Sequence, residues 1–231
     1  MLYPMPPNVI PYLLVGVSTL FFGIKALFLF RKSHNSLSLY FGLIGILIGI
    51  GTLLNSLPYV FTNQEFPLKV CIVIADSFLY AAIIVQTRLH WYFNNKKISY
   101  LWYIIPTLVL ITVIEIIILI TFSQNSFTYI NNIAYVPVNP LVGWLSAIAC
   151  LAFVETGILT TLHAKKINHT PQRYRMYFLG FAFMLGGIMA SYNYAALHGV
   201  NDNYTIIGYS VAAALLLIAI FVMSRRKTSR K

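Results

Sequence analysis

The chain has few acidic residues and few charges of either sign. Among 231 residues only five are Asp or Glu, against 16 Lys and Arg, and charged residues make up 9% of the sequence while hydrophobic ones make up 59%. Such a composition excludes a water-soluble fold. Cysteine is also scarce, because Cys71 and Cys150 are the two present. They lie in apolar stretches and provide neither a disulfide framework nor a metal-binding motif.

A positively charged start is missing as well. No Lys or Arg precedes Lys25. A cleavable signal peptide begins with such a charged region, so none is predicted. The first apolar stretch is therefore interpreted as a retained membrane anchor.

What the sequence has in abundance is long apolar stretches. Each is long enough to cross a hydrocarbon core of about 30 Å, which takes about 20 helical residues. The stretches are continuous and do not alternate with polar residues, which indicates helices and not a β-barrel. The sequence therefore predicts an all-α, multi-pass membrane protein with one domain, residues 1–231. The seven predicted transmembrane helices cover residues 9–30, 37–61, 68–93, 100–122, 141–163, 177–197 and 204–223.

The basic residues cluster on one side of this arrangement. They follow the first, third, fifth and seventh predicted helices, while Lys69 is the one basic residue near the opposite side. The positive-inside rule then places the N-terminus outside and the C-terminus in the cytoplasm. The net charge of +11 is thus a topology signal, with the lipid bilayer as partner and no nucleic acid. Short loops and the lack of a sorting signal favour a prokaryotic plasma membrane.

The longest predicted internal loop, residues 164–176, is basic. Together with the C-terminal tail, it is a candidate contact for a separate cytoplasmic protein. Pro171-Gln172 in this loop is interpreted as a turn. The basic residues of the loop are Lys165, Lys166, Arg173 and Arg175.

An internal repeat is one interpretation of the helix order. A displacement of 137 residues aligns the first three helices with the last three, pairing Gly49 with Gly186 and Tyr40 with Tyr177. The result is a 3+1+3 plan with parallel repeats, an arrangement that recurs in membrane carriers. The glycines themselves are interpreted mainly as sites where helices approach closely.

Three of the five carboxylates lie inside apolar stretches: Asp76, Glu115 and Glu155. A carboxylate in hydrocarbon is costly unless it is paired, protonated or hydrated, so each is a candidate functional residue. At about 1.5 Å per residue, Asp76 lies about 12 Å and Glu115 about 10 Å from the outer ends of their helices. Glu155 falls in the cytoplasmic half. Removal from water favours a protonated acid in general, which suits proton exchange.

Polar side chains at the same outer level complete a candidate site. We expect a ligand or cation pocket that opens outward, with Glu155 as a proton relay toward the cytoplasm. The competing interpretation is that each acid makes only an interhelical hydrogen bond. No catalytic residue, metal or cofactor is predicted, because the five histidines lie near the membrane boundaries without a ligand spacing. The predicted pocket residues are Asp76, Glu115, Tyr80, Asn55, Asn193 and Tyr209.

The seven-helix plan with an outer N-terminus resembles microbial rhodopsins, SWEET-type and KDEL-receptor-like carriers, and seven-helix sensor modules. The helix at 204–223 has no lysine for a retinal Schiff base, and the proline-glutamine helix motif of SWEET-like carriers is absent from the first and fifth helices. No functional residue is therefore transferred from these families.

The sequence favours a proton-linked carrier of a small solute or cation. One alternative is a sensor or receptor that binds its ligand in the same outer pocket and signals through a cytoplasmic partner. A membrane enzyme acting on a lipid or isoprenoid is a third, less favoured interpretation.

Overall fold

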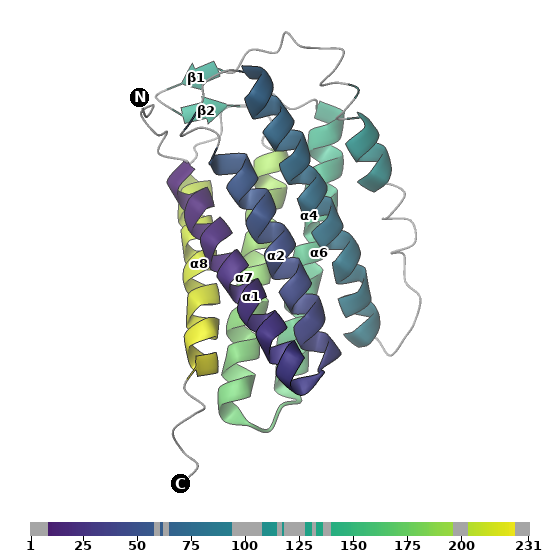
Figure 1. Cartoon of the computed structure of the whole chain (residues 1–231), viewed down its shortest axis with the longest axis vertical. Helices are drawn as coiled ribbons and strands as arrows, with labels where there is room; N and C mark the ends of the chain where they lie inside the picture. Colours follow the sequence, from purple (N-terminus) through teal and green to yellow (C-terminus); the bar gives the residue numbers. More distant parts are fainter. Residues whose placement is uncertain are drawn as a thin grey trace.

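The chain folds into a bundle of long helices that run side by side (Figure 1). The computed structural model describes residues 9–57, 61, 65–93, 108–114, 117, 128–130, 133–135, 140–195 and 203–224. Within these residues the long helices are α1 (Val9–Ser33), α2 (Ser36–Ser56), α4 (Glu65–Phe93), α6 (Pro140–Lys165), α7 (Thr170–Ala195) and α8 (Asn203–Ser224).

These helices close into a ring. Each of them packs on two neighbours, in the order α1, α2, α4, α6, α7, α8 and back to α1. The N-terminal ends of α1, α4, α6 and α8 lie at the same end of the bundle as the C-terminal ends of α2 and α7 (Figure 1). The interior of the ring is therefore bordered by side chains from every one of these helices.

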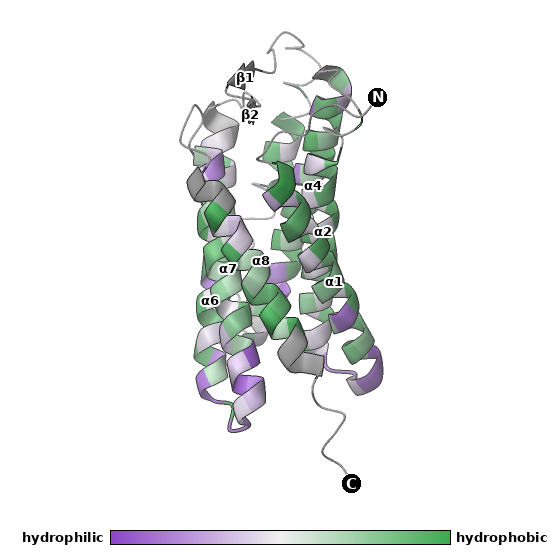
Figure 2. Ribbon diagram, turned by 90° about the vertical axis from the view of Figure 1, so that its left-hand side faces the viewer, coloured by the Kyte–Doolittle hydropathy of each residue, from purple (hydrophilic) through white to green (hydrophobic). Residues whose placement is uncertain are grey.

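Five helices are long enough and apolar enough to cross a membrane within the described part of the chain. They are Val9–Ser33, Ser36–Ser56, Phe66–Leu89, Gly143–Lys165 and Thr170–Ala195, and a shorter apolar segment covers Ile207–Ile220. Apolar residues also cover the outer surface of the bundle (Figure 2). On α1 an outward stripe with alternating spacings of four and three residues is about half exposed: Ile10, Leu14, Val17, Phe21, Ile24 and Phe28. Such an apolar outer face suits contact with lipid.

The predicted helical, multi-pass class is confirmed at this level, but several predicted boundaries were wrong. The loop expected at 164–176 is short, because α6 runs to Lys165 and α7 begins at Thr170. Pro171-Gln172 is therefore not a turn but lies in the first turn of α7. Proline is favoured at the first helical positions because its fixed φ suits the helix and its missing N–H would have no partner there.

Two further regions differ from or fall beyond the prediction. The loop predicted between residues 123 and 140 contains a short antiparallel hairpin of β1 (Thr128–Ile130) and β2 (Ile133–Tyr135). The fourth predicted helix, 100–122, lies mostly outside the described residues, although 108–114 and 117 are helical.

The turn between α1 and α2 is set by two residues. His34 adopts a positive φ of 50°, and its N–H donates to the Phe30 carbonyl at 2.7 Å, which satisfies an orphan carbonyl at the end of α1. Asn35 then caps α2, because its side chain accepts from the Leu37 N–H at 3.0 Å. The two helices are thereby forced into a tight antiparallel hairpin.

Glycines bring the helices of two hairpins into close contact. A Cβ on Gly23 of α1 would lie 2.5 Å from the Ile46 nitrogen and 2.8 Å from the Gly42 oxygen of α2. A Cβ on Gly157 of α6 would lie 2.7 Å from the Met184 nitrogen and 2.5 Å from the Gly180 oxygen of α7. Both crossings therefore depend on the absence of a side chain, as is common between membrane helices.

Candidate functional site

A cavity of about 130 Å³ lies inside the helix ring, and all six helices contribute to its lining. This volume is close to the ~150 Å³ of a buried protein cavity that accommodates benzene. Asp76 of α4 lines the cavity and is only 8% exposed. The predicted pocket residues Asn55, Asn193 and Tyr209 line it too, so four of the residues selected from the sequence meet at one site.

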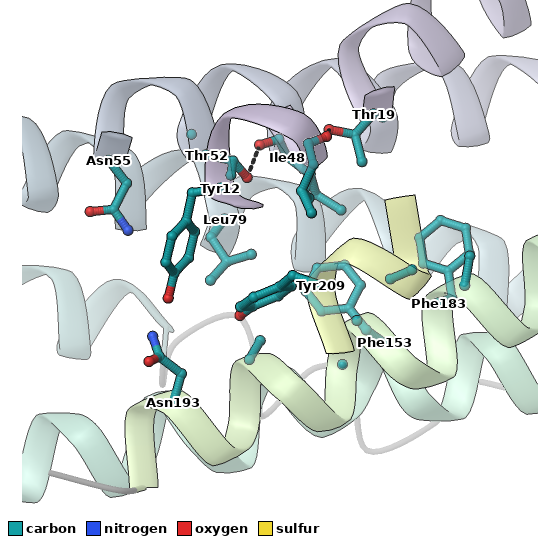
Figure 3. Close-up of a pocket in the computed structure, with 18 of the residues that line it drawn as sticks. Tyr12, Thr19, Ile48, Thr52, Asn55, Leu79, Phe153, Phe183, Asn193 and Tyr209 are labelled. Atoms are coloured by element: carbon teal, nitrogen blue, oxygen red, sulfur yellow. Dashed lines mark hydrogen bonds between the residues drawn. The ribbon is translucent and has the colours of Figure 1, made fainter. Parts of the chain in front are cut away.

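One end of the cavity is polar. The hydroxyls of Tyr12 and Tyr209 and the side-chain amides of Asn55 and Asn193 gather there (Figure 3). The two tyrosine rings pack with their centroids 5.1 Å apart. Asn193 is exposed, so this end lies nearest the surface of the protein.

The opposite end is closed by phenylalanines, which we call the aromatic floor: Phe22, Phe41, Phe153 and Phe183. Phe153 and Phe183 stack with centroids 6.4 Å apart and 10° between their planes. Phe41 links them to Phe22, with centroids 5.8 Å from Phe183 and 6.5 Å from Phe22. All four side chains are buried, and three of them line the cavity. The cavity therefore ends at an apolar plug supplied by α1, α2, α6 and α7 (Figure 3).

Asp76 is held by Tyr194 of α7, whose hydroxyl donates to Asp76 Oδ1. The carbonyl of Ala75 faces Gly51 of α2, which is one helical turn before Asn55, so Asp76 lies about 6 Å deeper than Asn55. Tyr194 also lines the cavity. The carboxyl group is thus positioned between the polar end and the aromatic floor.

Tyr80 does not line the cavity, although it was predicted to. It lies one turn after Asp76 on α4, it is 2% exposed, and its hydroxyl is 2.8 Å from the Ser146 hydroxyl of α6. The side-chain N–H groups of Gln86, further along α4, donate to the Ala152 carbonyl and the Thr156 hydroxyl of α6. Tyr80 and Gln86 therefore join α4 to α6 beside the cavity.

Glu155 does not line the cavity either. It shares the helical stripe of Trp144, Ile148, Leu151, Ile158 and Leu162, whose exposed fractions are 46 to 62% and which face away from the bundle. Glu155 itself is half-buried. Its role as a proton relay stays a prediction, and this placement gives it no surface on the cavity. Glu115 lies outside the described residues, so its predicted place in the pocket stays a prediction as well.

No basic side chain lines the cavity among the described residues. Lys25 lies toward the other end of α1, where its Nζ donates to the Ile220 carbonyl of α8 at 3.2 Å. The threonines that do line the cavity use their protons locally. Thr52 donates to the Ile48 carbonyl and Thr19 to the Val15 carbonyl, each at 2.7 Å (Figure 3). Their oxygens therefore face the cavity as acceptors.

Sequence reasoning missed Tyr12 and Tyr194 and misjudged Gly186. The first two are ordinary tyrosines near helix ends, and depth counting gives no sign of which way a ring points. Gly186 was paired with Gly49 as a packing glycine, yet a Cβ there would meet no atom within 4 Å. Gly186 lines the cavity, whereas the adjacent Gly187 packs against α6, with a would-be Cβ 2.8 Å from the Val154 nitrogen.

Comparison with known proteins identifies no relative: no family model, no curated protein and no solved structure matches the chain. In the described part of the chain, no three His, Cys, Asp or Glu side chains are grouped as metal ligands. The chemistry of the site therefore has to be argued from the cavity itself.

Proposed function

We propose that the protein is a seven-span carrier that binds a small solute or cation in the cavity and passes it through the helix ring. The observation that carries this proposal is a cavity that contains a carboxyl group, is lined by all six described long helices, and has a polar end near the surface and an apolar plug at the other end. Such a layout gives a carrier one binding site between two gates. The aromatic floor is the gate on the side of the basic helix ends, which we assign to the cytoplasm.

Two similar halves support this proposal. The first half is α1, α2 and α4, and the second is α6, α7 and α8. Packing around the ring has the same order in both, because α1–α2 corresponds to α6–α7, α2–α4 to α7–α8, and α8–α1 to α4–α6. A cavity at the junction of two such halves is the usual position of a carrier's binding site.

The glycine crossings support a duplication in more detail. Gly23 meets Ile46 and Gly42 just as Gly157 meets Met184 and Gly180. In the same way Gly49 packs against Leu20, and Gly187 against Val154. These pairs relate α1 to α6 by 134 residues and α2 to α7 by 138, so the uniform displacement of 137 is replaced by two displacements. The difference of four residues is absorbed around the turn between the helices of each hairpin.

Proton coupling in this proposal rests on Asp76. A carboxyl group that exchanges between a bound solute, Tyr194 and water is suited to couple proton movement to solute movement. Glu155 would act as a relay nearer the cytoplasm, outside the cavity. The Glu155→Gln variant would then slow transport without weakening solute binding.

The proposal is tested in proteoliposomes that contain a pH-sensitive dye. Addition of a transported solute should produce a solute-dependent pH change inside vesicles with the wild-type protein, and Asp76→Asn should reduce its initial rate at least tenfold. The Tyr192→Phe variant, changed on the same helix as Tyr194 but outside the cavity lining, is the matched control and should behave as wild type. Unimpaired transport by Asp76→Asn would contradict the proposed site.

A sensor is the second candidate, and the aromatic floor is the feature that favours it. A cavity that ends on four buried phenylalanines can hold a ligand without releasing it on the other side. A sensor would then bind solute with the same residues and show no uptake in the proteoliposome assay. The basic helix ends at Lys165, Lys166, Arg173 and Arg175, with the C-terminal tail, would contact its cytoplasmic partner.

A further inference from the structure

We propose that the ligand of the cavity is a small organic cation, an ammonium group on a short apolar body. This inference rests on the proposed function only in using the same cavity, and it adds the chemical class of the ligand. It is carried by three properties of the lining: the charge, the balance of hydrogen-bond donors and acceptors, and the aromatic surface.

The charge of the lining is of one sign. Asp76 is the acidic residue of the lining and no basic residue accompanies it there, within the residues that the structure describes. Tyr194 donates to one carboxyl oxygen, and a carboxylate can accept further hydrogen bonds. An anionic ligand would be repelled by this group, while a cation would neutralise it in a site of low dielectric.

The hydrogen-bonding groups around the cavity favour a donor. Thr19 and Thr52 have committed their protons to carbonyls of their own helices, so they present acceptor oxygens. Tyr194 has committed its proton to Asp76. A ligand that brings its own N–H groups, or a positive charge that needs only acceptors nearby, is matched to these oxygens.

Aromatic rings supply the rest of the lining. Three tyrosines surround the polar end and three phenylalanines the floor: Tyr12, Tyr194, Tyr209, Phe22, Phe153 and Phe183. Tyrosine faces attract cations and form the aromatic cages that recognise quaternary ammonium groups. The phenylalanine floor would receive an apolar substituent. Figure 3 shows that these two parts lie at opposite ends of the cavity, as an amphipathic cation requires.

The volume limits the size of this ligand. About 130 Å³ is slightly less than the ~150 Å³ of a cavity that holds benzene. The ligand therefore has roughly six to eight non-hydrogen atoms by this comparison. Choline and benzylammonium fall in this range and serve as probes, and each has a neutral counterpart of similar shape, 3,3-dimethylbutanol and benzyl alcohol.

The test is equilibrium binding to the purified full-length protein in nanodiscs, measured by calorimetry with these four probes. At least one cation should bind at least tenfold more tightly than its neutral counterpart, and Asp76→Asn should remove that preference. Asp76→Glu keeps the charge and should retain part of the preference. Glu155→Gln removes an intramembrane carboxylate outside the cavity and should leave the preference unchanged.

Equal binding of the cations and their neutral counterparts would overturn the inference, and so would an unchanged preference in a folded Asp76→Asn protein. Failure of this inference is distinguishable from failure of the carrier proposal. Uptake of a neutral solute, with no cation preference in binding, would overturn the ligand class and leave the carrier in place. A cation preference in binding, with no uptake, would support the ligand class and favour the sensor.

Discussion

At the scale of single residues, the site depends on one interaction between α4 and α7. Asp76 carries the charge of the cavity, and Tyr194 positions it by donating to Oδ1. Tyr194 is half-exposed at the end of α7, where it also forms part of the cavity wall. The pair therefore contributes both to the stability of the α4–α7 contact and to the geometry of the binding site.

We predict that the effects of Tyr194→Phe and Asp76→Asn on stability are not additive. Each single change removes one partner of a buried hydrogen bond, which costs about 1–3 kcal/mol. The double variant should be more stable than the sum of the two losses implies, by about 0.5–3 kcal/mol, because the interaction can be lost only once. Chemical or thermal unfolding in detergent measures this coupling. Tyr192→Phe with Asp76→Asn is the control pair and should be additive, whereas strict additivity for Tyr194 would show that the pair does not interact.

The sequence identified the acid and part of its surroundings. Asp76 was recognisable because a carboxylate in an apolar run is conspicuous, and Asn55, Asn193 and Tyr209 followed from their depth. Depth along a helix does not give direction around it, however. Tyr80 has the right depth but faces α6, Glu155 follows the outward stripe of α6, and Tyr194 was passed over beside Asn193.

At the scale of helices, glycines determine how closely each hairpin packs. Gly23 and Gly157 lie directly against backbone atoms of the neighbouring helix, which cannot move aside as a flexible side chain would. Gly186 lies in the same helix as Gly180 but beside open space. The chain thus provides two packing glycines in corresponding positions and a third whose Cβ position is empty.

We predict that Gly23→Ala and Gly157→Ala destabilise the protein to a similar extent. A methyl group at either site forces the helices apart, an overpacking cost of about 1–3 kcal/mol. For a chain of this size the melting temperature should fall by about 2–4 °C for each kcal/mol. Gly186→Ala is the control and should not lower the melting temperature, because the added Cβ meets no atom within 4 Å and alanine is the better helix former. A loss at Gly186 as large as at the two crossings would contradict the assigned packing.

Helix existence was easier to predict than helix ends. Apolar run length gave most of the long helices, but α7 begins seven residues before its predicted start because Thr170–Met176 is polar and basic. Those residues continue the helix beyond the apolar run, which a hydropathy criterion cannot detect. The hairpin of β1 and β2 lacks a strong turn sequence and was not predicted.

At the scale of the whole molecule, the closed ring turns scattered polar residues into one site. No single helix contains the cavity, since α1, α2, α4, α6, α7 and α8 each supply part of its wall. The sequence gave the helices and their direction of travel, but the order of packing around the ring could not be read from it. Side-by-side placement of α8 and α1 closes the ring, and it joins the two ends of the described chain (Figure 1).

The most direct test of this account is the reactivity of a cysteine placed in the cavity. In a protein with Cys71→Ala and Cys150→Ala, the Gly186→Cys variant should react with a cationic, membrane-impermeant methanethiosulfonate added on the outer side of the membrane. Choline or benzylammonium should slow the reaction, because reagent and ligand compete for one cavity. The matched Ile188→Cys variant, on the outward face of α7 with 47% exposure, should show no such protection. Absence of reaction at Gly186→Cys, or a rate that no cation alters, would contradict a water-accessible binding cavity.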